Sequence, residues 1–306
     1  MLREYMIELG YSNDDIDMII KTDQITRYKD ESLYNKIGEI FNYLLSLGYK
    51  REDIVKMTIM APGMFSYSIL NLDNKFKDLI GLGFSWKNVF EIIKCYPHIY
   101  GLSIDIINKK NEEMKQLGYS DNEIRKMIIN FPRLYSYGEG SLKKKFNFLL
   151  ELGFSKEDII FITKNYSNIY GYSVDRIRLQ MDYLLSLGYN QEDIIKMIKK
   201  LPTLFRLSID NIQLKIDSMI KLGYEHKDII KMTKIFPAIF SYSVDHINNK
   251  INEMVELGFS YNEILLMTKD LPSLLGLSID KIREKKEFFD WIGISQVMII
   301  NTKYMI

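Results

Sequence analysis

The stretch LGYNQEDIIKMIKKLPTLFRLSIDNIQLKI, from Leu187 to Ile216, places one proline between two amphipathic segments. Before it, an apolar set follows helical spacing and predicts a buried helix face: Ile194, Met197, Ile198 and Leu201. Pro202 has no amide hydrogen and disfavours helix in the residue before it, so this helix should end there. We expect the short apolar piece after Pro202 to form a single 3₁₀ turn.

A second helix should begin just after this turn. The Ser208 hydroxyl can cap free amides, and Asp210 places negative charge at the positive end of the helix dipole. The apolar positions of this helix predict its buried face: Ile209, Ile212, Ile216, Met219 and Ile220. Gly223 can take the left-handed conformation that ends a helix, and Tyr224 should then pack on Met219.

The same pattern recurs along most of the chain. Leu-Gly or Ile-Gly recurs with a first interval of 38 and then a constant step of 35, at Gly10, Gly48, Gly83, Gly118, Gly153, Gly188, Gly223, Gly258 and Gly293. All six prolines stand fourteen residues after such a glycine, with Ser167 filling the one gap: Pro62, Pro97, Pro132, Pro202, Pro237 and Pro272. A fixed period of this length indicates a helical repeat protein.

Helix starts repeat on the same register. Ser caps open the first helix of several repeats at Ser103, Ser173, Ser208, Ser243 and Ser278, and a cap with an acid three residues later opens the second at Ser155, Asn190 and Ser260. Neither helix can bury its apolar stripe alone, so neighbouring repeats must stack. We expect one all-α solenoid domain over 1–306, with an N-terminal cap and irregular unit at 1–67, six regular repeats at 68–277 and a C-terminal cap at 278–306.

Composition excludes several classes of protein. The chain has 306 residues, is 47% hydrophobic and 26% charged, and contains no apolar run of the roughly 18 residues that span a membrane. A lone Cys95 and three scattered histidines predict no disulfide, no metal site and a reducing intracellular compartment, which the sequence does not specify further. No phosphate loop or catalytic constellation is present, so we expect no cofactor and no enzymatic activity.

The arrangement of the Leu-Gly, the Asp-Ile that opens the second helix, the proline with its apolar patch and the following Ser and Lys closely resembles the repeat of the mitochondrial transcription termination factor (mTERF) family. The resemblance implies two α-helices and one 3₁₀ helix per repeat, curved around a groove. It also implies binding of double-stranded DNA or RNA, with a protein partner in some members.

Charge is concentrated in the middle of the chain. The net charge is only +1 and the pI about 7.6, whereas domains that grip nucleic acid commonly have a pI above roughly 9. Residues 1–67 and 243–277 each carry a net charge of −3, while 68–242 carry +6. Any basic surface should therefore lie in the central repeats.

Two columns of lysines recur at the repeat spacing. The first lies in the first helices and is interrupted by Gln180: Lys75, Lys110, Lys145, Lys215, Lys250 and Lys285. The second lies in the last turn of the second helices: Lys94, Lys164, Lys199, Lys234 and Lys269. These columns have two interpretations, because a solenoid turns equivalent lysines into a stripe that could meet phosphates, and because lysines there also cover apolar surface or complement helix dipoles.

Aromatic and arginine positions complete the candidate site. The aromatic column after the prolines suggests base stacking, but its spacing favours buried contacts between repeats: Phe65, Tyr100, Tyr135, Tyr170, Phe205 and Phe240. We extend the same interpretation to Tyr67, Tyr137, Tyr172 and Tyr242. Four arginines occupy positions that the repeat does not require, and they are candidates for nucleic-acid contacts: Arg133, Arg176, Arg178 and Arg206.

The sequence therefore predicts a monomeric protein that binds duplex DNA or structured RNA in its groove through backbone contacts, in organellar-type transcription regulation or ribosome assembly. A protein-binding scaffold without a nucleic-acid role is the alternative, because α-solenoids often present such a groove to a protein partner.

Overall fold

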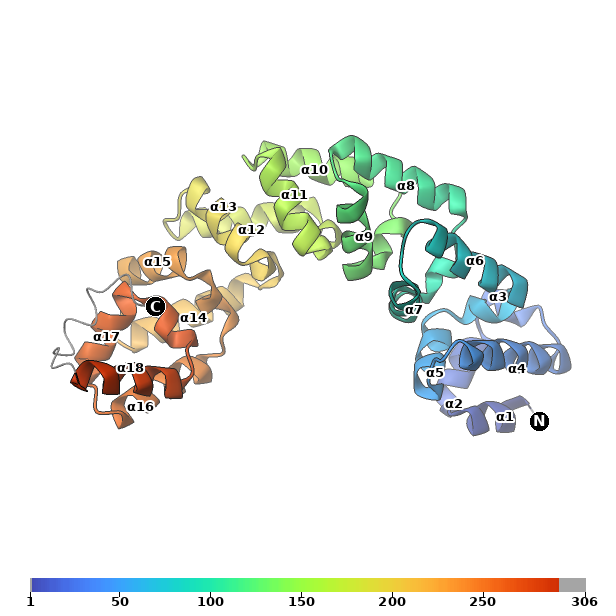
Figure 1. The fold of residues 1–306 in the computed structure, drawn as a ribbon, viewed down its shortest axis with the longest axis horizontal. Helices are drawn as coiled ribbons and strands as arrows, with labels where there is room; N and C mark the ends of the chain where they lie inside the picture. The colour runs from blue at the N-terminus through green and yellow to red at the C-terminus, as the bar shows by residue number, and fades with distance from the viewer. Residues whose placement is uncertain (1, 292–306) are drawn as a thin grey trace. The chain divides into compact units, whose positions relative to one another are not determined.

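The computed structural model describes residues 2–291, and within that range every regular element is a helix (Figure 1). The first ten α-helices are α1 (Leu2–Leu9), α2 (Asn13–Ile20), α3 (Asp23–Thr26), α4 (Asp30–Ser46), α5 (Arg51–Met60), α6 (Ile69–Gly81), α7 (Trp86–Cys95), α8 (Ile104–Leu117), α9 (Asp121–Asn130) and α10 (Ser141–Glu151). Those that follow are α11 (Lys156–Asn165), α12 (Val174–Ser186), α13 (Gln191–Lys200), α14 (Ile209–Lys221), α15 (His226–Ile235), α16 (Val244–Glu256), α17 (Tyr261–Asp270) and α18 (Ile279–Trp291). The later part of the expected C-terminal cap, 292–306, lies outside the described residues.

A short 3₁₀ helix follows each second helix of a repeat, as the sequence predicts. These helices are η1 (Pro62–Ser66), η2 (Pro97–Gly101), η3 (Pro132–Ser136), η4 (Ser167–Gly171), η5 (Pro202–Arg206), η6 (Pro237–Ser241) and η7 (Pro272–Gly276). In the stretch that opens the sequence analysis, α13 ends at Lys200 and Leu201 leaves the helical region with φ −135° and ψ 77°. Pro202 then starts η5, which confirms that the proline ends the second helix.

The chain forms two compact units. We call them the N-terminal unit, Met1–Leu149 with Thr163–Tyr170, and the C-terminal unit, Leu150–Ile162 with Gly171–Ile306. The organisation as one solenoid domain stays a prediction.

Helix ends follow the predicted capping chemistry. The Ser208 hydroxyl accepts the amide of Asn211 at 3.2 Å and starts α14. Gly223, with φ +89°, ends the helix in the left-handed region, and the amide of Tyr224 donates to the carbonyl of Met219 at 3.2 Å. Both bonds satisfy backbone groups that a helix end leaves unpaired.

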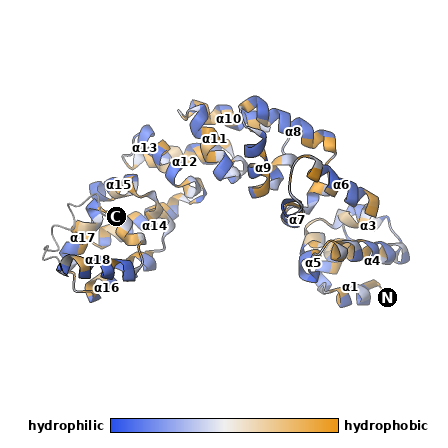
Figure 2. Cartoon of the chain, in the orientation of Figure 1, coloured by the Kyte–Doolittle hydropathy of each residue, from blue (hydrophilic) through white to orange (hydrophobic). Residues whose placement is uncertain are grey.

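The core consists of the apolar faces of the stacked repeats, visible as orange stripes on otherwise polar helices (Figure 2). Ile212, Ile216 and Met219 are buried as predicted. Ile220, also assigned to the buried face, is 46% exposed, because the residue after Met219 is rotated about 100° toward solvent.

The two aromatic columns differ in burial. All six residues of the column from Phe65 to Phe240 are buried, which confirms their predicted role. Tyr67, Tyr137, Tyr172 and Tyr242 are only half-buried, so their predicted burial was wrong. They lie at the C-terminal end of the 3₁₀ helices, where the chain passes over the surface. Tyr67 reaches the next repeat there, since a Cβ atom added at Gly101 would lie 2.8 Å from its hydroxyl.

Buried hydroxyl pairs connect several neighbouring repeats. A tyrosine after the Leu-Gly meets a threonine from the second helix of the next repeat, with oxygen separations of 2.5–2.6 Å, at Tyr11 with Thr58, Tyr119 with Thr163, Tyr189 with Thr233 and Tyr224 with Thr268. In three of these pairs the threonine hydroxyl donates to a carbonyl of its own helix, so the tyrosine donates to the threonine.

Candidate nucleic-acid interface

Most of the lysine column of the first helices is buried in the array. Four of its members are only 4–7% exposed: Lys75, Lys110, Lys215 and Lys250. Their ammonium groups meet acceptors of the same chain: Lys110 lies 2.5 Å from Glu113 and 3.1 Å from the carbonyl of Gly138, and Lys250 lies 2.6 Å from Glu253. These side chains therefore serve as contacts within the array.

Two lysines of this column donate to the aromatic column of their own repeat, in the 3₁₀ helix that follows the second helix. The half-buried Lys145 donates to the carbonyl of Tyr170, and the buried Lys215 donates to that of Phe240. Desolvation by burial lowers the pKa of both lysines. Gln180, which interrupts the column, is 4% exposed, and its amide nitrogen has no hydrogen-bond partner among the described residues.

The lysine column of the second helices forms ion pairs between neighbouring repeats. Each lysine meets the acid in the first turn of the preceding second helix, at Lys94 with Asp53 (3.0 Å), Lys164 with Glu123 (3.1 Å), Lys199 with Asp158, Lys234 with Asp193 (2.6 Å) and Lys269 with Asp228 (2.7 Å). One pair of neighbouring repeats lacks this ion pair, and both of its residues are replaced. Asn88 stands at the position of the acid, and Ile129 stands at the position of the lysine in the next repeat.

These ion pairs also act on the carboxylates. The pKa of Asp228 is lowered, mainly by the hydrogen bond from Lys269. The pKa of Glu123 is lowered, mainly by the hydrogen bond from the backbone of Ser120. The same acids therefore cap their own helix and bind the next repeat, which leaves the second lysine column engaged within the chain.

The four arginines are exposed and differ in their contacts. Arg176 on α12 donates to the carbonyl of Arg206 at 2.8 Å, and its guanidinium lies 4.9 Å from the centre of the Tyr172 ring. Arg178 projects from the same helix. Arg133 in η3 and Arg206 in η5 have no ion-pair partner within residues 2–291.

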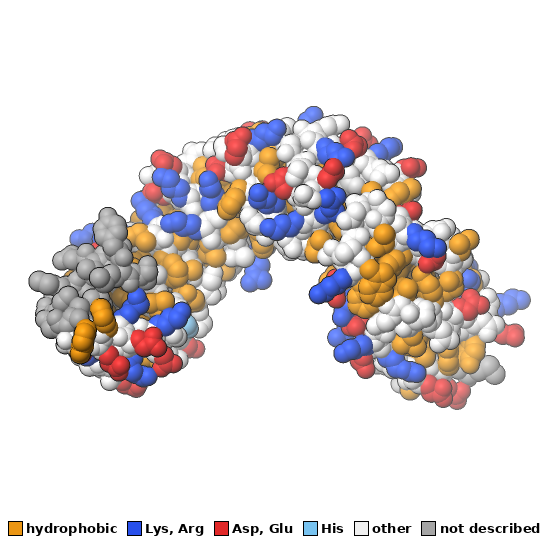
Figure 3. Space-filling view, in the orientation of Figure 1, with side chains coloured by type: hydrophobic (Ala, Val, Ile, Leu, Met, Phe, Trp, Pro, Cys, Tyr) orange, Lys and Arg blue, Asp and Glu red, His pale blue; other side chains and the backbone are white. Residues whose placement is uncertain are grey.

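Acidic residues are absent from the 3₁₀ helices. Although 40 of the 306 residues are Asp or Glu, none occurs in any of the segments η1 to η7. Elsewhere the two signs are interspersed, as the visible face in Figure 3 shows. Arg133 and Arg206 therefore lie on surfaces where no carboxylate of the same 3₁₀ helix competes with a bound anion.

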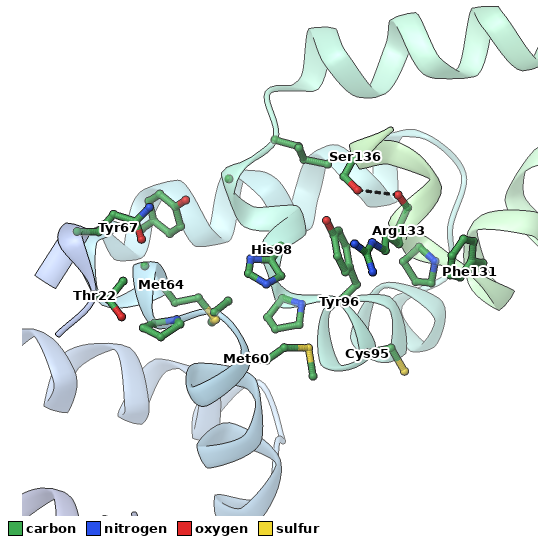
Figure 4. A pocket seen from close by; sticks show the side chains of 18 of the residues that line it. Thr22, Met60, Met64, Tyr67, Cys95, Tyr96, His98, Phe131, Arg133 and Ser136 are labelled. Carbon is green, nitrogen blue, oxygen red and sulfur yellow. Dashed lines mark hydrogen bonds between the residues drawn. The ribbon is translucent and has the colours of Figure 1, made fainter. Parts of the chain in front are cut away.

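In the N-terminal unit this surface contains a cavity of about 900 Å³ (Figure 4). It is lined by η1, η2 and η3, by the ends of α5, α7 and α9, and by Thr22 and Gln24. Arg133 supplies a cation, His98 an imidazole, and Tyr96 and Phe131 aromatic rings, and no acidic residue lines it. The sequence analysis missed both rings, which it could have found from the residue just before each proline.

A second cavity, of about 850 Å³, lies between α8 and the start of α10. It has a different chemistry, because Lys109, Lys110 and Lys143 share its lining with Glu112, Glu113 and Glu139. The balanced charges offer a polyanion no net attraction. We therefore take the cavity along η1 to η3 as the candidate interface of the N-terminal unit.

The repeat geometry defines the class of the protein, an α-solenoid in which each regular repeat contributes two α-helices and one 3₁₀ helix. The sequence model of the mTERF family matches residues 2–152 and 179–291. The chain thus belongs to the mTERF family, whose members are nucleic-acid-binding, non-enzymatic helical-repeat proteins. The unmatched segment includes η4, where Ser167 replaces the proline. No curated protein matches the chain.

Residues 2–291 contain neither a membrane-spanning helix nor a cluster of metal ligands. No helix there is long and apolar enough to cross a bilayer. No group of three or more His, Cys, Asp or Glu side chains in that range could hold a metal ion.

Proposed function

We propose that this protein binds duplex DNA or structured RNA through phosphate contacts on its acid-free 3₁₀ surfaces, in organellar-type transcription regulation or ribosome assembly. The observation that carries the proposal is the complete exclusion of Asp and Glu from η1 to η7 in a chain rich in both. Phosphate binding depends on cations that are not already neutralised. Membership in the mTERF family supports the same function.

The direct contacts belong to Arg133 in the N-terminal unit and Arg206 in the C-terminal unit. Both are exposed, and guanidinium groups suit phosphate because they donate two parallel hydrogen bonds. Arg176 holds the carbonyl of Arg206 and so supports the η5 backbone. In this proposal the two lysine columns stabilise the array and contribute only to the general electrostatic potential, because their ammonium groups are paired within the chain.

A salt titration of binding tests this proposal. Fluorescence anisotropy would measure the Kd for a labelled duplex DNA and for a hairpin RNA between about 50 and 200 mM salt, the range over which phosphate contacts weaken steeply. We expect Arg133→Ala with Arg206→Ala to weaken binding and to reduce the slope of log Kd against log salt by about 2, or about 1 per phosphate contact.

The matched control is Arg283→Ala. Arg283 is also an exposed arginine, but it belongs to α18 and not to a 3₁₀ helix, and it pairs with Asp280 at 2.8 Å. Its removal should leave the salt slope unchanged. Absence of any binding by the unsubstituted protein at 50 mM salt would refute the proposal, and equal effects of the test and control variants would remove Arg133 and Arg206 from the interface.

A protein-binding scaffold is the second candidate. The observation in its favour is that most lysines of the two columns are used in contacts within the chain, in a protein with a net charge of only +1. Recovery of the protein with one stoichiometric protein partner and no nucleic acid would support this function over the first.

A further inference from the structure

Three aromatic residues of the N-terminal unit stand immediately before a 3₁₀ helix, at the start of η2, η3 and η4. Tyr96, Phe131 and Tyr166 occupy this position in three consecutive repeats, and all three are half-buried. The position does not require an aromatic ring for folding, because Ala61 occupies it before η1, and Leu201 and Leu271 occupy it in the C-terminal unit, where Phe236 is the one ring. A half-exposed ring retained in successive repeats is therefore available for a ligand.

Two of these rings line the cavity of the N-terminal unit. Tyr96 lies against His98, with ring centres 5.5 Å apart, and Phe131 meets Tyr137 edge to face at 6.2 Å. These contacts hold the rings in place while leaving part of each exposed. Figure 4 shows the Tyr96 ring drawn next to the guanidinium of Arg133, and both side chains line the same cavity.

The lining combines three kinds of side chain that proteins use to recognise nucleotides. The aromatic rings offer surfaces for base stacking, Arg133 offers a cation for phosphate, and the amides of Asn130 and Gln24 offer donors and acceptors for base edges. No carboxylate is present to repel phosphate. Charge and hydrogen-bonding capacity thus both match a nucleotide chain.

A paired duplex cannot use the aromatic part of this lining, because its base faces are covered by neighbouring bases in the stack. Unpaired nucleotides expose those faces and can stack on protein rings. The geometry points to a specific ligand: we propose that the cavity along η1 to η3 binds unpaired, single-stranded nucleotides. This inference rests on the proposed nucleic-acid function and specifies which form of nucleic acid the N-terminal unit takes.

The test compares three probes on the full chain: labelled 12-nucleotide oligo(dT), oligo(rU) and a blunt DNA duplex of the same length. The variant is Tyr96→Leu with Phe131→Leu, which keeps apolar bulk and uses a residue that other repeats tolerate at this position. We expect it to weaken single-strand binding by about ten-fold or more, since each stacked base contributes substantially to affinity. Duplex binding should change less than about two-fold by the same reasoning.

The control is Phe236→Leu, at the equivalent position of the C-terminal unit. The repeats before and after it have leucine at that position, Leu201 and Leu271. It should leave the affinity for all three probes unchanged. Circular dichroism at 222 nm would establish equal helicity, and Tyr96→Phe, which keeps the ring, should retain single-strand binding.

The outcomes separate this inference from the function on which it rests. Salt-dependent duplex binding that requires Arg133, combined with single-strand affinity that the double leucine variant does not alter, would overturn the single-strand proposal and leave the proposed function intact. Failure of every probe to bind would overturn both. Selective loss of oligo(dT) and oligo(rU) binding in the double variant supports the inference.

Discussion

At the scale of single residues, the chain matches the two sides of several joints in polarity. Tyr119, Tyr189 and Tyr224 follow the Leu-Gly, and the residue that each meets in the next repeat is threonine. Tyr49 is the exception, because the equivalent residue of the next repeat is Ile93 and the Tyr49 hydroxyl donates to the carbonyl of Phe90 at 3.0 Å. Where Phe follows the Leu-Gly, at Phe84 or Phe154, the equivalent residue of the next repeat is isoleucine. An unpaired buried hydroxyl costs free energy, so each buried tyrosine needs an acceptor from the next repeat, either a threonine hydroxyl or, at Tyr49, a backbone carbonyl.

This matching predicts a non-additive mutant cycle at Tyr189 and Thr233. Thr233→Val should destabilise the protein by about 1–3 kcal/mol, because it leaves the buried Tyr189 hydroxyl without its acceptor. The double variant Tyr189→Phe with Thr233→Val should recover much of that loss. Urea unfolding of the single and double variants measures the coupling, and strictly additive losses would contradict the role of the pair.

Residue-level predictions from the sequence succeeded where the repeat itself dictates the environment. The prolines, caps and glycines located the helices, and the column that includes Tyr135 and Phe205 proved buried. Sequence spacing alone could not assign partners to the lysines, because the acid that meets Lys234 lies on the preceding repeat at Asp193. The sequence did hold one signal of that pairing, because the acid and the lysine are both replaced in the same pair of repeats, by Asn88 and Ile129.

At the scale of elements, α10 is the helix that departs from the repeat pattern. Gly138, Glu139 and Gly140 replace the Ser-Ile-Asp start of other repeats, so α10 begins only at Ser141. A carboxylate from α8 compensates, because Glu113 accepts the amide of Lys143 at 3.2 Å and also holds Lys110 at 2.5 Å. Negative charge thus reaches the positive end of α10 from the neighbouring repeat.

Removal of this carboxylate should destabilise the joint strongly. Glu113→Ala leaves the ammonium of Lys110, whose side chain is 4% exposed, without its ionic partner, and we expect a loss of about 3 kcal/mol. Glu113→Gln, which keeps an acceptor, should lose less. The midpoint and slope of urea unfolding provide the measurement, with the exposed Glu192→Ala as control. A loss no larger than that of the control would show that Glu113 is dispensable.

At the scale of the whole molecule, the many buried tyrosines make stability depend on alkaline pH. Burial raises the pKa of Tyr119 and Tyr224 to about 12, from an ordinary value of 10.0. Above pH 10 the unfolded chain releases phenolic protons that the folded chain retains, so stability present below pH 10 is lost as the pH rises toward 12. Each such tyrosine should cost about 1.4 kcal/mol at pH 11.

Urea unfolding at pH 8, 9.5 and 11 checks this expectation. Lys145 and Lys215 act in the opposite direction, because their lowered pKa makes the folded chain release protons before the unfolded chain does. The informative comparison is therefore with Tyr224→Phe, Thr268→Val, which removes one buried phenol and its acceptor. This variant should lose less stability between pH 9.5 and 11 than the unsubstituted protein. An identical pH dependence would contradict the assignment.

The paired joints have a consequence for how such a chain can change length. Tyr189 and Asp193 present the same two groups to the following repeat as Tyr224 and Asp228 do, so Thr268 and Lys269 could serve either set. Excision of one 35-residue period between them would rejoin compatible halves. The joint after Phe84 and Asn88 differs, since Phe84 has no hydroxyl and Asn88 no charge, so a lysine placed there would lose its ionic partner. The hydroxyl and charge at a joint therefore influence which recombined arrays are stable.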